Sequence, residues 1–408
     1  MNPNRVRRLL RVFRPGVLFL IFSSVGLPAT RAQGLDWDGS LRAYQFFGLE
    51  RSPFSPPERR RDAELLLVRL RADSALSSRV ALQSQTVFQF VSPNLAEAAG
   101  LATASTRTFL PLDHDFTESR RVDLDLAVDR LNLEIDLDQV RLVVGRQAIS
   151  WGVAYIWPVL DLFAPFAPER IDREYKPGVD AVRATIPLGT FSEMELIAGI
   201  LGRSLRKDGA AGLLTRVHVG WADVGVMGGR FHRDSVAGAF LASDVRGTAL
   251  RGELSWTRSG DPEDRAGNRL SFWRATLGMD RQLSGTVSLS GEAAWNGYGV
   301  SNSADYPEVA SSDRIARGEI TGLGQLYAGV SAAWRFHPLG SLSGTLLLNW
   351  QDPSVLWVPA LVWSTGNNSE VLLGSQIGFG RKVGEAGGPG SEYGGVEATV
   401  FGAFRQHF

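Results

Sequence analysis

The sequence contains no cysteine, which excludes disulfide bonds and thiolate metal sites. It has only three lysines, so nearly all of its positive charge comes from arginine. HExxH and comparable metal spacings, GxSxG and P-loop motifs are absent, and the five histidines are scattered: His114, His218, His232, His337 and His407. We therefore predict that the protein is not an enzyme and uses no metal and no other cofactor.

Long apolar runs are also missing. Beyond the N-terminal segment, no stretch approaches the 18 consecutive apolar residues that indicate a transmembrane helix. The N-terminal segment has five arginines, then the apolar run Val17 to Val25, then small residues at Thr30 and Ala32, which is the order of a secretory signal peptide. We predict a signal peptide over residues 1–32, cleaved after Ala32. The alternative is an uncleaved anchor, but its apolar part is short compared with the ~20 residues that span a bilayer.

Charge and composition suggest one exported domain. Six of the 43 basic residues lie in residues 1–32, which leaves 37 basic against 43 acidic residues and a net charge near −6 in the mature chain. This balance argues against a nucleic-acid partner. Residues 33–408 contain no linker-like stretch or composition break, so we expect a single domain.

Eighteen segments alternate apolar and polar residues, as β-strands with one apolar face do. In one of them Trp273, Leu277 and Met279 share one parity, whereas Arg274 and Thr276 share the other. Connections after even-numbered segments are short, and those after odd-numbered segments are often long. This pattern predicts an all-β fold, a transmembrane antiparallel β-barrel of about 18 strands (16 is the alternative count), with short periplasmic turns and long extracellular loops.

Two aromatic patterns support a barrel in the outer membrane of a Gram-negative bacterium. Tryptophans recur near segment ends, where aromatic girdles would lie; a soluble β-protein with core tryptophans is the alternative. These residues are Trp221, Trp256, Trp295, Trp334, Trp350, Trp357 and Trp363. The chain ends in Phe408, with Phe404, Val400, Ala398 and Val396 on the same parity. This resembles the C-terminal signal that the barrel-assembly machinery recognises.

The segment from Val122 to Leu137 changes parity midway. Its leucines and valines occupy one parity up to Val128 and the other from Leu131 onward. A regular strand with this change of parity could not keep its apolar residues on one face, so we predict a β-bulge near Asp129 and Arg130.

The long connection 151–177 is too apolar and aromatic for an exposed loop. We predict that it folds into the barrel as a constriction, and that its charged tail up to Lys176 faces the solute path. The residues expected to form this constriction are Trp151, Tyr155, Trp157, Asp161, Phe163 and Phe166.

Charged residues on the polar parities are candidates for the pore lining. They would create a transverse field that selects solutes by charge; the alternative is that they pair with one another and hold a hydrated wall together. These residues are Arg141, Arg183, Arg216, Arg251, Arg274, Arg335, Glu134, Asp136, Glu253 and Glu292.

A family resemblance covers about 40 residues around Gly145, Arg146, Gln147, Trp151 and Gly152. This GRQxxxWG segment resembles that of a group of proteobacterial outer-membrane β-barrel proteins of the DUF1302 type. The resemblance implies an outer-membrane barrel and does not identify the solute. It also leaves the side of Arg146 open, because Arg146 shares the parity of Leu142 and Val144.

The sequence thus predicts a porin-like channel for passive diffusion of small solutes, charged or uncharged. Its expected partners are outer-membrane lipids, the barrel-assembly machinery and the solutes, and no pattern in the sequence sets an oligomeric state. One rival is an export conduit for a polysaccharide or another polymer. Another is a plugged structural barrel or an enzyme located at the barrel rim.

Overall fold

The computed structural model describes residues 35–48, 63–92, 108–117, 123–260, 270–382, 390–396 and 398–408. The expected signal peptide, residues 1–32, lies outside them. The described residues form one antiparallel sheet of 19 strands. The strands are β1 (Leu35–Gly48), β2 (Ala63–Ala75), β3 (Val80–Val91), β4 (His114–Thr117), β5 (Asp123–Asp136), β6 (Arg141–Gln147), β7 (Val179–Pro187), β8 (Glu193–Ile200), β9 (Gly209–Val219), β10 (Ala222–Phe231), β11 (Asp234–Val245), β12 (Thr248–Arg258), β13 (Ser271–Gln282), β14 (Val287–Asn296), β15 (Leu326–His337), β16 (Gly340–Asn349), β17 (Ser354–Gly366), β18 (Ser369–Phe379) and β19 (Thr399–His407).

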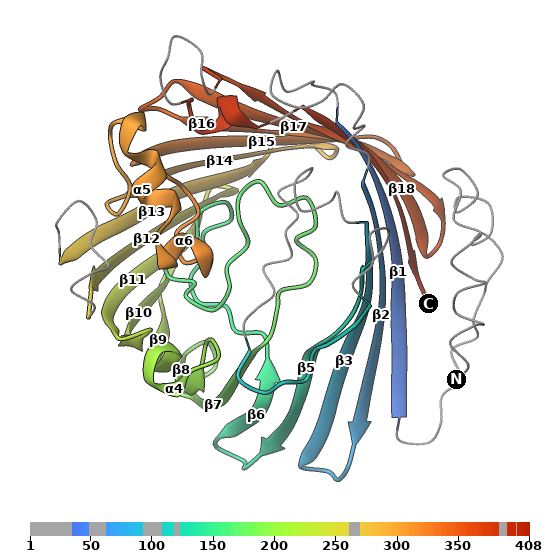
Figure 1. The fold of residues 1–408 in the computed structure, drawn as a ribbon. Coiled ribbons are helices and arrows are strands. Elements are labelled where there is room, and N and C mark those ends of the chain that lie inside the picture. The colour runs from blue at the N-terminus through green and yellow to red at the C-terminus, as the bar shows by residue number, and fades with distance from the viewer. Residues whose placement is uncertain are drawn as a thin grey trace.

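The sheet closes on itself, as Figure 1 shows, because β1 pairs with both β2 and β19. Strand β4 is not part of the closed circuit. It pairs with the half of β5 from Leu124 to Leu126, beyond the point where β6 ends. Eighteen strands therefore make the barrel, and the sequence prediction of an 18-stranded antiparallel barrel is confirmed.

The barrel has two different ends. At one end, the turn end, eight connections of two to five residues join β2 to β3, β5 to β6 and so on to β17 and β18. At the other end, the loop end, the connections range up to 31 residues. All the helices of the described residues are single short turns: α4 (Leu205–Asp208), η3 (Ser303–Asp305), α5 (Tyr306–Ala310), α6 (Asp313–Ala316) and η5 (Tyr393–Gly395). No helix in the described ranges is long and apolar enough to cross a membrane.

The apolar parity of β13 faces outward. On β13, Leu277 is 70% exposed and Trp273 is 53% exposed, whereas Arg274 and Thr276, on the other parity, are buried. Six of the seven tryptophans expected in aromatic girdles are exposed large side chains as well: Trp221, Trp295, Trp334, Trp350, Trp357 and Trp363. A core position for these six is therefore ruled out, and the polar parity lines the lumen.

The predicted bulge is confirmed in β5. Arg130 pairs with Gln85 and Val128 pairs with the next residue, Thr86, so that Asp129 is the extra residue. The bulge keeps leucines on the outer face on both sides of it, and Leu131 and Leu133 beyond it are exposed.

The last strand is shorter than the sequence pattern indicated. The sequence placed Val396 on the parity of Val400 and Phe408, but η5 occupies Tyr393–Gly395, β19 begins at Thr399, and Val396 packs against buried lumen residues. At its far end Phe408 exchanges two backbone hydrogen bonds with Gly39 (2.9 and 3.0 Å). A Cβ at position 39 would lie 2.4 Å from the Phe408 ring, so Gly39 makes room for it. Phe404 lies on the same side as the exposed Val400. Recognition of this end by the assembly machinery stays a prediction.

Candidate functional site

The connection between β6 and β7, residues 148–178, lies inside the barrel (Figure 1) and is called the lumen loop below. Its entry is set by two glycines with positive φ, Gly145 (122°) and Gly152 (95°). A Cβ at Gly145 would lie 2.3 Å from the carbonyl oxygen of Leu131, and one at Gly152 would lie 2.4 Å from Glu253 Oε1. Both positions therefore require glycine.

Arg146 is almost fully buried at the same entry. Its guanidinium binds Asp180 (3.0 Å) and Asp113 (3.2 Å), and it donates to the carbonyl oxygens of Leu110 (2.6 Å) and Val128 (3.0 Å). Although Arg146 shares the parity of Leu142 and Val144, the conformation of Gly145 separates it from their lipid-facing stripe. The GRQ segment therefore fixes the base of the lumen loop.

Two buried glutamates hold the first half of the lumen loop by its backbone. Glu253 on β12 accepts hydrogen bonds from the amides of Val153, Ala154 (2.5 Å) and Leu160 (3.1 Å). Glu292 on β14 accepts those of Tyr155 (2.9 Å), Ile156 (3.0 Å) and Trp157 (2.6 Å). The two carboxylates thus satisfy six backbone donors that the loop itself cannot pair.

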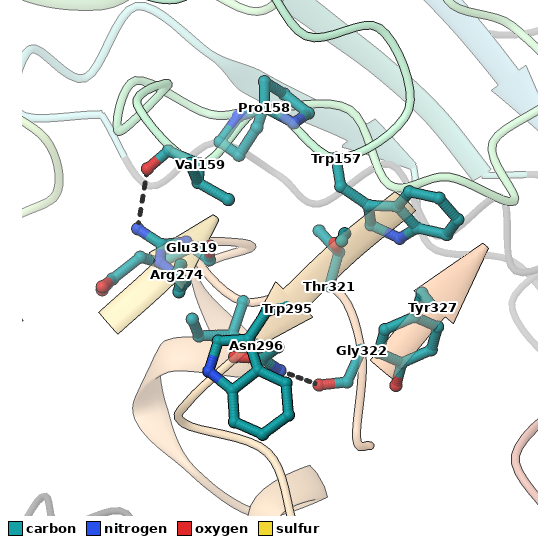
Figure 2. A pocket seen from close by; sticks show the side chains of 13 residues that line it. Trp157, Pro158, Val159, Arg274, Trp295, Asn296, Glu319, Thr321, Gly322 and Tyr327 are labelled. Atoms are coloured by element: carbon teal, nitrogen blue, oxygen red, sulfur yellow. Dashed lines mark hydrogen bonds between the residues drawn. The ribbon is translucent and has the colours of Figure 1, made fainter. Parts of the chain in front are cut away.

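Strand β13, between these two glutamates, binds carbonyl groups of the lumen loop. Arg274 donates to the carbonyl of Val159 (3.1 Å), and the Thr276 hydroxyl donates to that of Trp157 (2.7 Å). Figure 2 shows Trp157 and Val159 above Arg274, Asn296 and Tyr327, around a small pocket between the loop and the wall. Both kinds of backbone group on the loop therefore have partners on the barrel wall.

Aromatic packing fixes the lumen loop at two further places. Trp151 packs edge-on against Phe163 (5.0 Å between ring centroids) and Phe231 (5.9 Å). Trp157 packs against Tyr327 (5.6 Å). Trp151, Trp157 and Phe163 are buried, whereas Tyr155 is 71% exposed and lies under the Arg251 guanidinium. Phe166 lies 5.0 Å from the Arg170 guanidinium.

The charged tail of the lumen loop pairs mostly with the opposite wall. Arg42 on β1 binds Asp172 (2.8 Å) and Glu174 (2.5 Å). Burial alone would raise the pKa of Asp172, but Arg42 holds this pKa below its ordinary value. The Tyr175 ring lies close to the guanidinium groups of both Arg42 (4.6 Å) and Arg69 (4.1 Å).

Lys176 returns to the loop itself rather than facing a solute path. It pairs with the buried Asp161 and donates to the carbonyl of Ile149 (2.6 Å). Asp161 is thus a structural anchor for the end of the loop.

A second segment, residues 297–325 between β14 and β15, packs near the loop end and carries α5 and α6 (Figure 1). Arg314 is completely buried there and binds Asp234 (2.6 Å) and Glu319 (2.8 Å). Burial alone would raise the pKa of Glu319, but Arg314, Arg317 and Arg274 lower it to about 2. The apolar residues Tyr298, Val309 and Ile320 of this segment form a buried cluster with Phe272. This segment was not among the predicted lumen-facing connections, although its buried Tyr298, Val309 and Ile320 are apolar side chains in a long connection, as are the aromatic residues of 151–177.

The candidate pore-lining residues fall into two groups. Toward the turn end, arginines pair with acids on neighbouring strands. These pairs are Arg141 with Glu134 (3.1 Å), Arg183 with Glu195 (3.7 Å), Arg216 with Glu193 (3.2 Å) and Arg251 with Asp280. Arg335 binds the carbonyl of Gly285 (3.0 Å), and Asp136 accepts the amide of Asp138 (3.0 Å) within the β5–β6 turn.

Three of the candidates do not line an open path. Glu253, Glu292 and Arg274 are each only 4% exposed, because the lumen loop covers them. Their parity was read correctly, but parity alone does not show what covers a lumen-facing side chain. They are anchors of the loop, whereas the side chains of the paired arginines Arg141, Arg183 and Arg216 toward the turn end are 61%, 27% and 38% exposed.

Comparisons with known proteins bear on the fold. No protein-family model matches the chain, and no curated protein matches its sequence. OccAB2 of Acinetobacter baumannii is 8% identical, with a TM-score of 0.54 over 92% of this chain and 98% of that one. OpdK of Pseudomonas aeruginosa, solved with vanillate, is 12% identical, with a TM-score of 0.53 over 92% and 99%. The chain therefore has the fold of outer-membrane porins of Gram-negative bacteria.

Proposed function

We propose that this protein is an outer-membrane channel for passive diffusion of small solutes, narrowed by the lumen loop. The observation that carries this proposal is the attachment of the loop to opposite walls, by Glu253 and Glu292 on one side and by Arg42 on the other. A loop attached in this way is a stationary constriction. In the same proposal, the signal peptide 1–32 exports the chain and the barrel-assembly machinery inserts it into outer-membrane lipid.

The charges toward the turn end suit a hydrated path better than a reaction centre. Each arginine of the four pairs named above has a carboxylate partner on the strand next to it, so the wall is polar without an isolated reactive group. Alternating charges on a lumen wall order water and act on the dipoles of passing solutes. We also propose that the GRQxxxWG segment marks a family of such barrels, because Gly145, Arg146 and Gly152 all shape the entry of the lumen loop.

Conductance across a planar bilayer tests the proposal. The refolded mature chain should give steady single-channel currents with an ion selectivity that reversal potentials in asymmetric salt measure. Deleting Leu160 to Arg170 removes the middle of the lumen loop and should raise the conductance, provided that circular dichroism shows the same strand content. Unchanged conductance in a folded deletion variant would contradict the role of the loop as a constriction.

A plugged structural barrel is the second candidate, because one observation favours it. The segment 297–325 packs beside the lumen loop, with Arg274 donating to both the carbonyl of Val159 and that of Glu319 (2.9 Å). Two segments tied to one arginine leave less room for solutes. A correctly folded barrel without measurable current would favour this second candidate.

A further inference from the structure

A pocket of about 180 Å³ lies between the lumen loop and the inner faces of β2, β3 and β5. Leu67 and Arg69 contribute from β2, Val87 from β3 and Ala127 from β5. The loop contributes Arg170 and Pro177, among others. Two aromatic residues of the loop pack away from this pocket, Trp151 against Phe231 of β10 and Trp157 against Tyr327 of β15, whereas Tyr175 is part of its lining.

The acidic groups of the pocket are already paired. Asp129 pairs with Arg69, Asp172 with Arg42 (2.8 Å) and Asp113 with Arg146 (3.2 Å). The fourth aspartate, Asp125, also has an interaction partner. These carboxylates therefore offer little to a cationic solute, because each such solute would have to displace an existing partner.

Arg170 differs from these residues. Within the described part of the chain its guanidinium has no hydrogen bond and no ion pair; it lies 5.0 Å from the Phe166 ring, and Asp172 and Asp129 act on its charge without pairing with it. Burial lowers the pKa of Arg170. A guanidinium remains charged at neutral pH and presents a planar fork of N–H donors that matches a carboxylate.

We infer that this pocket is a solute subsite in which Arg170 binds the carboxylate of a small organic monoanion while Leu67, Val87, Ala127 and Pro177 contact its aliphatic body. The Arg170 guanidinium and the apolar side chains line the same pocket. A solute with both a carboxylate and an aliphatic chain therefore makes more favourable contacts there than an inorganic anion does. This inference rests on the proposed channel function, since the subsite lies beside the constriction. It makes Arg170, on the loop, the residue that sets the preference among charged solutes.

Block of the potassium chloride current by three probes tests the subsite. Pentanoate carries the charge and the aliphatic body, acetate lacks the body, and pentylammonium reverses the charge at equal length. We expect pentanoate to block at lower concentration than acetate, and pentylammonium to block least. Arg170→Gln should raise the half-blocking concentration of pentanoate about tenfold, the cost of one charge-assisted hydrogen-bonded partner, whereas Arg170→Lys should change it less.

Arg79→Gln is the matched control, because it removes an arginine of the β2–β3 turn that is already paired with Asp138 (3.0 Å) outside the pocket. It should leave the block by pentanoate unchanged. Equal block by pentylammonium, or equal block of wild type and Arg170→Gln by pentanoate, would overturn the inference. If the wild-type barrel passes no current, the binding of pentanoate to the refolded protein should be measured by calorimetry. Binding that depends on Arg170 would refute the diffusion channel but uphold the subsite. No binding would refute both.

Discussion

Replacement of Glu292 by alanine should release the lumen loop from β14. The change removes the acceptor of three backbone amides, those of Tyr155, Ile156 and Trp157. Each buried donor left without a partner costs about 1–3 kcal/mol, so the loop conformation loses roughly 3–9 kcal/mol, and the lower part of that range applies where water reaches the amides. The barrel itself should stay folded, because its strand ladder does not depend on Glu292.

Thiol chemistry measures this release directly, because the chain has no cysteine and a single introduced one is the only reactive thiol. Ile156 is 6% exposed, so a cysteine at this position reacts only when the loop opens. At about 1.4 kcal/mol per factor of ten, a loss of about 4 kcal/mol should speed modification of Ile156→Cys by nearly a thousandfold in the Glu292→Ala background. The single-channel conductance of Glu292→Ala should rise or fluctuate between levels.

Glu134→Ala is the control for this prediction. Glu134 is also a lumen-facing glutamate, but it is half exposed and paired with Arg141 (3.1 Å). Exposed ion pairs contribute about 0–1 kcal/mol, so Glu134→Ala should leave the reactivity of Ile156→Cys nearly unchanged. Equal reaction rates in the Glu292→Ala and Glu134→Ala backgrounds, together with equal conductance, would refute the assignment of Glu292 as an anchor.

Two further predictions concern the entry of the lumen loop and the segment 297–325. Gly145→Ala places a Cβ within 2.3 Å of the Leu131 carbonyl oxygen at a φ of 122°. It should therefore lower the free energy of unfolding, measured by urea titration, by about 1–3 kcal/mol. Gly344→Ala is the control and should leave this free energy unchanged, because the nearest atom to its Cβ lies 3.8 Å away. Burial raises the pKa of Glu392 from 4.5 to about 7, and its carboxylate accepts the amide of Leu323 (3.0 Å). Because a raised carboxyl pKa means that stability is lost as pH rises from 4.5 through 7, hydrogen exchange at Leu323, corrected for its intrinsic rate, should speed up over that range. Glu392→Gln should abolish this pH dependence, and a dependence that persists in this variant would show that another group titrates.

The fold was predictable because a period of two in hydrophobicity carries most of the information about a membrane barrel. The parity of Trp273 and Leu277 fixed which face meets lipid, and the parity switch after Val128 located the bulge at Asp129. The side of Arg146 could not be derived in the same way. Its parity matches the lipid-facing Val144, and only the positive φ of Gly145, a property of the folded chain, separates Arg146 from that stripe.

The role of each lumen charge depends on its height in the barrel as well as its parity. Glu134 and Asp280 lie within three residues of the turn end of their strands and pair with arginines of neighbouring strands. Glu253 and Glu292 lie near the middle of β12 and β14, at the level of the lumen loop, and bind backbone amides instead. A carboxylate beside a strand neighbour is best satisfied by a long cationic side chain, whereas one beneath an irregular loop is satisfied by the unpaired amides of that loop. The distance of a residue from the short turns can be counted from the sequence once the strands are assigned. In a barrel with a long apolar connection, a lumen-facing glutamate in the middle of a strand is therefore better interpreted as an anchor of that connection than as a pore-lining residue.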